Sequence, residues 1–445
     1  MRIGIHLFHK DLRINDNLAL NELSKHVDRV IGLFIFDRTQ IKKTHKNAAF
    51  YSDFAAQFVV DSVNDLNQQC GGKLVIQYGD PVVVLVKIIK IVKPVAVSFN
   101  MDFTPYATMR DLDVSNRCSR LGIKVISNPD DQSLTKMQSM IKKDGEPYLV
   151  YGAFFKNLNT HSIERPTTKR IVWTAIRLPQ YHNAKHLDIG LAGGRKEGLR
   201  RLKHNISTTS DKVGSPTSRL SAYMNQGCIS VREVYWATNK KALSSIAWRD
   251  FFLCIYRFHK SGNNYHRFVH SEYDKIKWTR LRLAEWKHFI ECKTGFILVD
   301  AIMTELLSTG FINNRSRLIL ATFWIKYLMI NPFDPVYGSQ VWFSRLLIDC
   351  SASQNKLNHQ WVIGDLDVSG RRFALKGCNP LTGRHMQIDN DVVIKYDPQF
   401  EYIKKWIPSF ADKSIKECKQ LLKQIVPMYQ WRERYQQYNK LFKGL

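Results

Sequence analysis

The chain has 445 residues, of which 44% are apolar and 12% aromatic, and this composition excludes a disordered chain, which is poor in both. Its length exceeds what one compact core usually serves, so we expect two domains. The 66 Lys and Arg against 39 Asp and Glu leave a net charge of +27, which points to a polyanionic partner, nucleic acid first and an anionic membrane surface second.

The first part of the chain alternates short apolar runs with amphipathic segments. We predict strands in five runs rich in Val, Ile and Phe: Ile3–Phe8, Val30–Phe36, Leu74–Tyr78, Val95–Phe99 and Lys124–Ile126. We predict helices in the segments between them: Asn17–Lys25, Ala48–Cys70, Pro81–Lys90 and Tyr106–Leu121. This alternation indicates an α/β domain with a doubly wound parallel sheet, which we place at residues 1–127.

The pattern weakens between residues 128 and 215, where Gly, Pro and Thr cluster, and we interpret this stretch as a connector. From Thr217 onward the predicted elements are helices: Thr217–Met224, Ser230–Ala237, Leu243–His259, Leu281–Phe289, Leu298–Leu307, Asn314–Met329 and Gln340–Cys350. We therefore predict an all-α C-terminal domain over residues 216–445, which ends in a basic helical segment, Trp431–Phe442.

Charge is unevenly divided between these regions. Residues 1–130 hold 17 Lys and Arg and 13 Asp and Glu, a net of +4, which leaves +23 for the rest of the chain. This asymmetry assigns the surface that faces a polyanion to the helical domain.

No feature of the sequence is typical of a membrane-spanning or exported protein. No run approaches the roughly 20 apolar residues of a membrane span. The first residues are interrupted by His6, His9 and Lys10, unlike a signal peptide. The eight cysteines are scattered and form no C-x-x-C pair, which argues against a zinc site and for free thiols in a reducing compartment. We expect no metal site and an intracellular protein, cytoplasmic or nuclear.

A hydroxyl-rich segment opens the helical region. In Thr217-Ser218-Arg219-Leu220-Ser221, hydroxyls and free backbone N–H groups at a helix start can bind phosphate oxygens. The same residue types also form ordinary helix N-caps, so this segment alone leaves both interpretations open.

Several segments, taken together, resemble the cryptochrome/DNA photolyase family. They are Phe8–Leu20, Thr217–Ser221, Trp248–Phe252, Lys293–Met303, Asn314–Arg317, Asp349–Trp361 and Lys395–Pro398. The order and spacing of the motifs between Lys293 and Phe323 resemble the family's flavin-pocket signature. The resemblance covers nearly the whole chain, is closest to the deoxyribodipyrimidine photolyases, and implies an N-terminal α/β domain followed by an all-α FAD-binding domain.

The resemblance implies a set of residues that bind FAD: Thr217, Ser218, Arg219, Leu220, Ser221, Arg249, Asn314, Arg317, Asp349 and Asn355. Arg317 and Asp349 would form an ion pair against the isoalloxazine ring; a buried charge pair is unfavourable unless it is well hydrogen-bonded, so it usually marks a site. Asn355 would lie near flavin N5. A second, antenna chromophore (folate or deazaflavin) stays undecided, because Tyr106–Asp111 does not clearly reproduce a folate-binding pair.

The reaction implied by the resemblance is light-driven repair of pyrimidine dimers in DNA, a carbon–carbon lyase reaction in which reduced FAD donates an electron. Its catalytic residues would be Asn355, Trp248, Ser245 and Trp278. Damaged DNA would be bound by a monomer through Trp248, Arg249, Phe252, Arg315 and Trp361. Each aromatic residue taken alone is equally compatible with core packing.

Some positions depart from the family's pattern at the lesion. Ser245 stands where dimer-repairing members carry a glutamate, and Leu318 stands where they carry a methionine. The segment Asn313–Leu318 lacks the histidine pair that a (6-4) photolyase would need. A second function therefore stays open, a cryptochrome-like blue-light receptor or a repair-incompetent relative that binds FAD and DNA. A DNA-binding scaffold without flavin does not explain the flavin-pocket signature.

Other departures affect the tryptophan chain that reduces the flavin in this family. His359 occupies the position of the first tryptophan, the second falls at Pro332 or Phe333, and Trp278 matches the outermost one. The sequence leaves open whether another aromatic residue replaces this route, and the candidates are Trp324, Trp342 and Tyr327.

Overall fold

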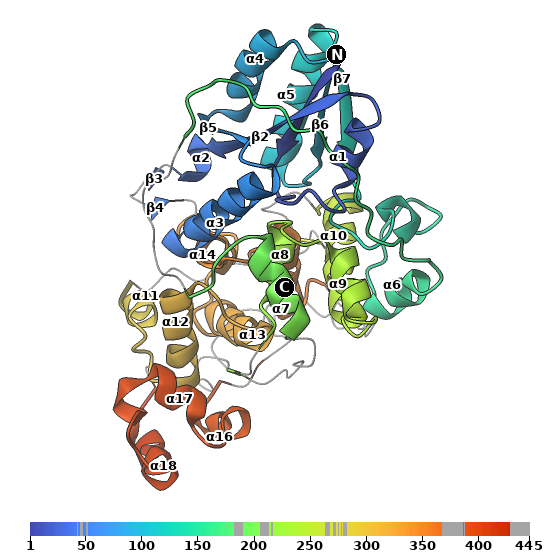
Figure 1. Ribbon diagram of the computed structural model, residues 1–445. Helices are drawn as coiled ribbons and strands as arrows, with labels where there is room; N and C mark the ends of the chain where they lie inside the picture. Colours follow the sequence, from blue (N-terminus) through green and yellow to red (C-terminus); the bar gives the residue numbers. More distant parts are fainter. Residues whose placement is uncertain are drawn as a thin grey trace.

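The computed structural model describes residues 1–41, 43–44, 48–49, 52–181, 190–204, 213–214, 217–262, 268–269, 273–274, 276, 278, 283–366, 386 and 388–427. Within them the chain forms an N-terminal α/β domain and a larger helical domain, which lie one above the other in Figure 1. Every described helix is too short or too polar to cross a bilayer.

A sheet of five parallel strands forms the centre of the N-terminal domain, in the order β5-β2-β1-β6-β7. The strands are β1 (Ile3–Phe8), β2 (Arg29–Asp37), β5 (Val75–Gly79), β6 (Ala96–Asn100) and β7 (Lys124–Asn128). In the register, Ile5 of β1 lies opposite Ile31 and Val97. The predicted strands and the doubly wound sheet are confirmed. The sequence could predict them because parallel strands that are buried on both faces consist of continuous apolar runs.

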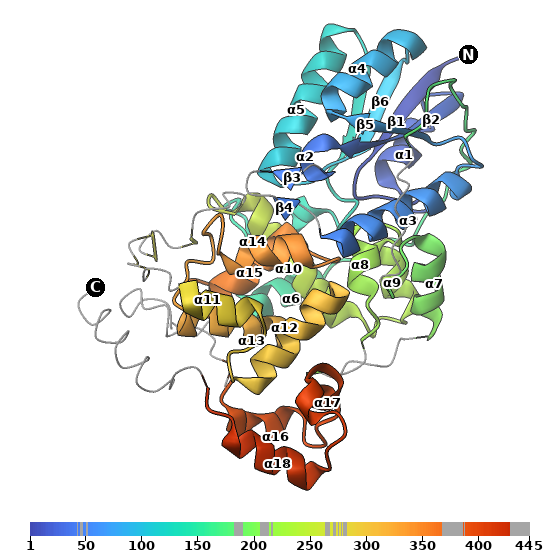
Figure 2. The same ribbon diagram turned by 90° about the vertical axis from the view of Figure 1, so that its left-hand side faces the viewer.

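Helices cover both faces of this sheet. On one face α4 (Pro81–Val92) and α5 (Pro105–Arg120) pack against the strands, for example through Leu85 and Val114. On the other face α1 (Leu18–Leu23) and α3 (Asp53–Gln69) share one apolar core with the helical domain. In both views α3 lies between the sheet and the helical domain (Figures 1 and 2).

The predicted helix Ala48–Cys70 begins later than expected. Ser52 caps α3 by accepting a hydrogen bond from the Ala55 N–H at 3.2 Å, so the helix starts at Asp53. Upstream of it lie the short helix α2 (Arg38–Ile41) and the strand pair β3 (Lys43–Thr44) and β4 (Ala48–Ala49).

The connector carries the 3-10 helix Met137–Met140 and the helices α6 (Tyr151–Leu158) and α7 (Arg195–His204). Between them it runs along the sheet: the Val30 N–H donates to Val172 O at 3.0 Å, and the Thr174 N–H donates to Val30 O at 2.9 Å. The connector thus pairs part of the β2 edge that β5 leaves uncovered.

The helical domain is all-α, as predicted. Its helices are α8 (Leu220–Asn225), α9 (Val231–Ala237), α10 (Leu243–Phe258), α11 (Leu283–Ile290), α12 (Ile297–Thr309), α13 (Asn314–Thr322), α14 (Ser339–Leu346), α15 (Ala352–Ile363), α16 (Val393–Tyr396), α17 (Glu401–Trp406) and α18 (Ile415–Gln424), with 3-10 helices at Asn390–Val392 and Pro408–Phe410. The predicted segment Trp431–Phe442 lies outside the described residues.

Two predicted helices are shorter than expected. The segment Asn314–Met329 changes from α-helix to a π-helix at Phe323–Tyr327. The segment Gln340–Cys350 leaves the helix after Leu346, because the Ile348 N–H donates to Gly310 O at 2.9 Å instead of continuing the helical ladder.

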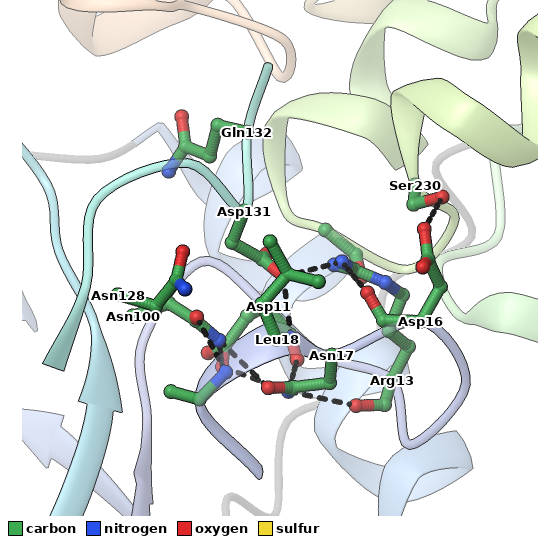
Figure 3. A network of polar contacts seen from close by, with 12 residues as sticks. Asp11, Arg13, Asp16, Asn17, Leu18, Asn100, Asn128, Asp131, Gln132 and Ser230 are labelled. Carbon is green, nitrogen blue, oxygen red and sulfur yellow. Dashed lines mark hydrogen bonds and ion pairs between the residues drawn. The ribbon is translucent and has the colours of Figure 1, made fainter. Parts of the chain in front are cut away.

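A buried polar network joins the two domains through the loop that follows β1 (Figure 3). Arg13 donates to Asp131 Oδ1 at 2.8 Å and to the Gly227 carbonyl at 3.1 Å, and Ser230 Oγ donates to Asp16 Oδ2 at 2.6 Å. The opening motif of the chain therefore holds the turn between α8 and α9 against the sheet. Asn17 in the same motif caps α1, as expected of a residue at that place.

Gly227 is required at this junction for two reasons. Its φ of 66° lies in the left-handed region, and a Cβ atom there would meet the Lys10 carbonyl oxygen at 2.2 Å. At Gly227 the backbone of the helical domain therefore lies so close to the backbone of the loop after β1 that no side chain fits between them.

Candidate functional site

A cavity of about 870 Å³ lies among α8, α10, α13 and α15 of the helical domain. The predicted FAD residues that line it are Thr217, Ser218, Arg219, Leu220, Ser221, Arg249, Asn314, Arg317 and Asp349. The remaining one, Asn355, lines a smaller recess, which shares Arg317, Ser351 and Gln354 with the cavity. The fold thus gathers around one connected space residues that are up to 138 positions apart, Thr217 and Asn355.

The hydroxyl-rich segment leads into α8 at one end of the cavity. Arg219 adopts a left-handed φ of 53°, which is uncommon for a residue with a side chain. Its guanidinium lies 5.2 Å from the centre of the Phe311 ring, and the Leu220 N–H donates to Ser218 Oγ at 3.4 Å. Hydroxyls, backbone N–H groups and one cation therefore converge where a pyrophosphate could bind.

The predicted ion pair between Arg317 and Asp349 is present. Arg317 Nη2 donates to both carboxylate oxygens of Asp349, at 2.7 and 2.8 Å, and the guanidinium also donates to Ile312 O at 2.9 to 3.0 Å. The Asp349 side chain is 2% exposed and that of Arg317 22%. A charge pair this buried depends on its hydrogen bonds, and here they are made.

Asn355 fits a ligand that offers an N–H group. Its Nδ2 donates to Gln340 O at 2.8 Å and to Ser344 Oγ at 3.1 Å, which assigns the amide orientation. Its Oδ1 is buried and accepts no hydrogen bond from a described residue. A buried acceptor without a partner is what an N–H of a bound ring would satisfy.

His359 lies one turn further along α15 and lines the same recess. Its Nδ1 is 2.6 Å from Asn355 O, and burial lowers the pKa of the imidazole to about 4. The ring is therefore neutral at neutral pH, with Nδ1 as the donor, because a carbonyl can only accept.

Aromatic side chains and a hydroxyl form the other side of the cavity. Ser245, Trp248 and Phe252 of α10 line it together with Trp361 of α15. Trp248 stacks on Tyr151 of α6 at 3.7 Å between centroids, and the Trp361 ring lies nearly parallel to it at 5.8 Å with planes 16° apart. This arrangement provides flat apolar faces on which bases could stack.

Three predicted residues are placed differently from the rest. Arg249 lines the cavity, but its guanidinium donates to Gln132 O in the connector, and burial lowers its pKa. Arg315 does not line the cavity, and its Nη1 lies 3.8 Å from Met386 Sδ. Trp278 packs against the C-terminal core and does not line the cavity.

The cavity also contains residues that the sequence analysis missed. Thr238 and Lys241 line it beside α10, and Gln354 and Asn358 line it on α15. The spacing of Gln354, Asn358 and Trp361 on α15 is i, i+4, i+7, which places them on one helical face. This spacing is present in the sequence, but it indicates a shared face only if residues 352–363 are known to form a helix.

Comparisons with known proteins agree with this geometry. Residues 4–170 match the model of the DNA photolyase family, and residues 242–439 match that of the FAD binding domain of DNA photolyase. A deoxyribodipyrimidine photo-lyase of Synechococcus sp. is 27% identical over 442 residues, covering 90% of this chain and 86% of the relative. A cryptochrome DASH of Xenopus laevis is 26% identical over 460 residues, covering 92% and 83%.

A solved structure shows the same fold over the full length. The archaeal photolyase from Sulfolobus tokodaii, determined with two FAD molecules, has a TM-score of 0.84 and 26% identity, and the match covers 100% of both chains. The helical domain is thus an FAD-binding domain, and FAD is the cofactor of this protein. The chain belongs to the DNA photolyase/cryptochrome family.

Proposed function

We propose that this protein repairs cyclobutane pyrimidine dimers in DNA, using light and reduced FAD. The observation that supports the proposal is that one cavity joins two chemically different halves. The half with Thr217–Ser221, Arg317 and Asp349 suits a dinucleotide cofactor, and the half with Trp248 and Trp361 suits nucleobases.

In the cofactor half, the hydroxyls and backbone N–H groups of Thr217–Ser221 would hold the pyrophosphate of FAD. The hydrogen-bonded Arg317–Asp349 pair would present a fixed dipole to the flavin, and the buried Asn355 Oδ1 would accept a hydrogen bond from it. When bound and reduced, FAD supplies light absorption and a one-electron donor.

In the substrate half, Trp248 and Trp361 offer stacking faces to a dinucleotide turned out of the duplex. The Ser245 hydroxyl can donate a hydrogen bond to a pyrimidine carbonyl. A dimer is already poorly stacked, so it leaves the helix at a lower free-energy penalty than intact bases, and this difference favours damaged sites.

The charge of the chain supports binding to the DNA backbone. The region after residue 130 carries +23, and Lys241 lies at the cavity lining. We therefore expect the affinity for undamaged DNA to fall steeply as salt rises, because each phosphate contact releases a counterion.

The deciding experiment is repair with chemically reduced protein. Protein with measured FAD content is reduced anaerobically, mixed with an oligonucleotide that contains one thymine dimer, and illuminated; recovery of intact thymines is quantified against a dark sample. Chemical reduction removes any dependence on how the flavin is reduced in the cell. Protein that holds FAD but restores no thymines contradicts the proposal.

A second candidate, a blue-light receptor, is favoured by one observation. Asp349 is the one carboxylate among the described residues that line the cavity, and it is paired with Arg317, so no free acid faces the substrate half. The variant Ser245→Glu separates the two functions. It should raise the repair yield about tenfold or more, since a hydrogen bond to a charged group is worth about 1.5 kcal/mol or more.

The control for this variant is Ser244→Glu, since Ser244 is exposed and does not line the cavity. No repair by the wild type or by either variant, with normal FAD content, favours the receptor.

A further inference from the structure

Three tryptophans form a cluster behind the recess that contains Asn355. The ring centroids of Trp324 and Trp342 are 6.0 Å apart, those of Trp286 and Trp342 5.0 Å, and those of Trp286 and Trp324 5.4 Å. We call Trp286, Trp324 and Trp342 the tryptophan cluster. Each ring contacts the other two, so an electron vacancy on one can be filled from either neighbour.

One ring separates the cluster from the recess. Phe343 lines the recess beside His359, and its edge meets Trp324 with the centroids 6.0 Å apart. Trp324 is completely buried, so it lies on the inner side of the cluster. An electron donor on Trp324 is thus one side chain away from the space that holds the flavin.

The opposite side of the cluster reaches the surface. Trp342 is only partly buried, and Trp286 contacts the half-buried ring of Tyr337 at 5.3 Å. The indole N–H of Trp324 donates to Tyr337 O at 2.7 Å, and that of Trp342 donates to Val336 O at 2.9 Å. One loop therefore fixes two of the rings, and the cluster extends from Phe343, which lines the recess, to the partly exposed Trp342.

The backbone at Trp324 is unusual as well. Trp324 lies on the π-helix Phe323–Tyr327, a conformation that is rare and occurs often at functional sites. Simple core packing does not require a π-turn. The other two aromatic candidates are placed less favourably: Tyr327 packs on Phe296 and Phe323, and among the described residues Trp278 makes no ring contact with the cluster.

We infer that the tryptophan cluster is the route by which light reduces oxidised FAD in this protein. Trp324 gives one electron to the light-excited oxidised flavin, and Trp342 or Trp286 returns one electron to Trp324. The oxidised outer indole releases its N–H proton to water and is restored by one electron and one proton from a thiol in solution. In a second turnover the once-reduced flavin accepts the second electron, the flavin takes up two protons from water, and the two oxidised thiols join as one disulfide. The inference rests on FAD binding alone and is independent of the repair reaction.

The experiment compares Trp324→Phe and Trp342→Phe with Trp236→Phe as the matched control, because Trp236 packs against a different apolar core. Trp278→Phe is included to test the outermost position that the resemblance implies. Each protein, loaded with FAD and free of DNA and oxygen, is illuminated with blue light in the presence of dithiothreitol, and the loss of the oxidised flavin's absorption is followed. We expect Trp324→Phe to slow photoreduction about tenfold or more, Trp342→Phe to slow it severalfold, and Trp236→Phe to match the wild type. Transient absorption should show a tryptophan radical that Trp324→Phe lacks.

FAD content and reduction by dithionite are measured first, so that a misfolded variant is recognised. If Trp324→Phe does not hold FAD, Trp324→Tyr and Trp342→Phe carry the test. Photoreduction of Trp324→Phe at the wild-type rate, loss of photoreduction in Trp278→Phe alone, or a wild type that light does not reduce would each overturn the inference. Repair by the dithionite-reduced variants should equal that of the wild type, which separates this inference from the proposed function.

Discussion

Tyr151 and Trp248 stack face to face, with ring centroids 3.7 Å apart and planes 2° apart. Tyr151 belongs to α6 of the connector, and its hydroxyl donates to Ser244 O at 3.2 Å, one turn before Trp248 on α10. The position of one cavity wall is therefore set by a segment outside the helical domain.

Replacing Tyr151 should weaken recognition of a dimer without affecting the cofactor. Tyr151→Ala removes one face of the stack around Trp248, and an aromatic pair is worth about 0.5–1.5 kcal/mol, so we expect two- to tenfold weaker binding of dimer-containing DNA. Fluorescence anisotropy measures the affinity, and FAD absorbance checks the cofactor. Tyr78→Ala removes the stack between Tyr78 of β5 and Tyr181 of the connector, far from the cavity lining, and should leave the affinity unchanged. Equal affinities for Tyr151→Ala and wild type would show that Trp248 keeps its position in the cavity wall without Tyr151.

Arg317→Ala should remove FAD from the protein. Without the guanidinium, the carboxylate of Asp349 stays buried with no charge partner, which destabilises by about 3 kcal/mol or more. The FAD-to-protein ratio after purification and the urea midpoint report the two effects. Arg315→Ala is the matched control, because Arg315 does not line the cavity. Normal FAD content in Arg317→Ala would contradict the assigned role of the pair.

His359 should make the protein less stable in acid. Burial lowers the pKa of His359 from 6.5 to about 4, so the unfolded chain takes up a proton that the folded protein excludes as pH falls through this range. The exclusion of this proton contributes roughly 3 kcal/mol to the free energy of unfolding, and this contribution is fully present above pH 6.5. We expect the difference in unfolding free energy between wild type and His359→Phe to shift by about this amount between pH 7 and pH 4.

Urea unfolding at a series of pH values measures this difference. His288→Ala, at an exposed position, should show no such shift relative to the wild type. Parallel pH curves for wild type and His359→Phe would mean that the folded protein binds the proton after all.

Gly227→Ala should destabilise the protein more than Gly122→Ala, although both glycines have a left-handed backbone conformation. Gly122 has nearly the same φ, 68° against 66°, but a Cβ atom there meets nothing within 4 Å. Gly122→Ala should therefore lower the unfolding free energy by about 1 kcal/mol, the strain of a left-handed residue. Gly227→Ala adds the clash with Lys10 O, so we expect a loss larger by about 2 kcal/mol or more. Equal losses in urea would mean that the two domains separate easily at this turn.

The sequence predicts the sheet domain well, because its strands are apolar on both faces and its helices are amphipathic. It does not predict α15, since polar residues such as Asn355, Lys356 and Gln360 are buried on this helix along with apolar ones, which removes any periodic pattern. The FAD residues follow from the resemblance, yet the role of Tyr151 does not, because its partner Trp248 lies 97 positions away. The contact between Trp324 and Trp342 depends on a π-helix that helix propensities do not encode.

The core that α1, α3 and one face of the sheet share with the helical domain has a consequence for how the molecule behaves as a whole. Phe58 of α3 meets Tyr223 of α8 edge to face at 5.1 Å, so the interface is continuous with the interior on both sides. The apolar side chains of this shared core are enclosed only when the two domains pack together, so we expect the two domains to unfold together. Because a ligand that binds only the folded state stabilises it, we expect bound FAD to raise the unfolding temperature of the sheet domain together with that of the helical domain.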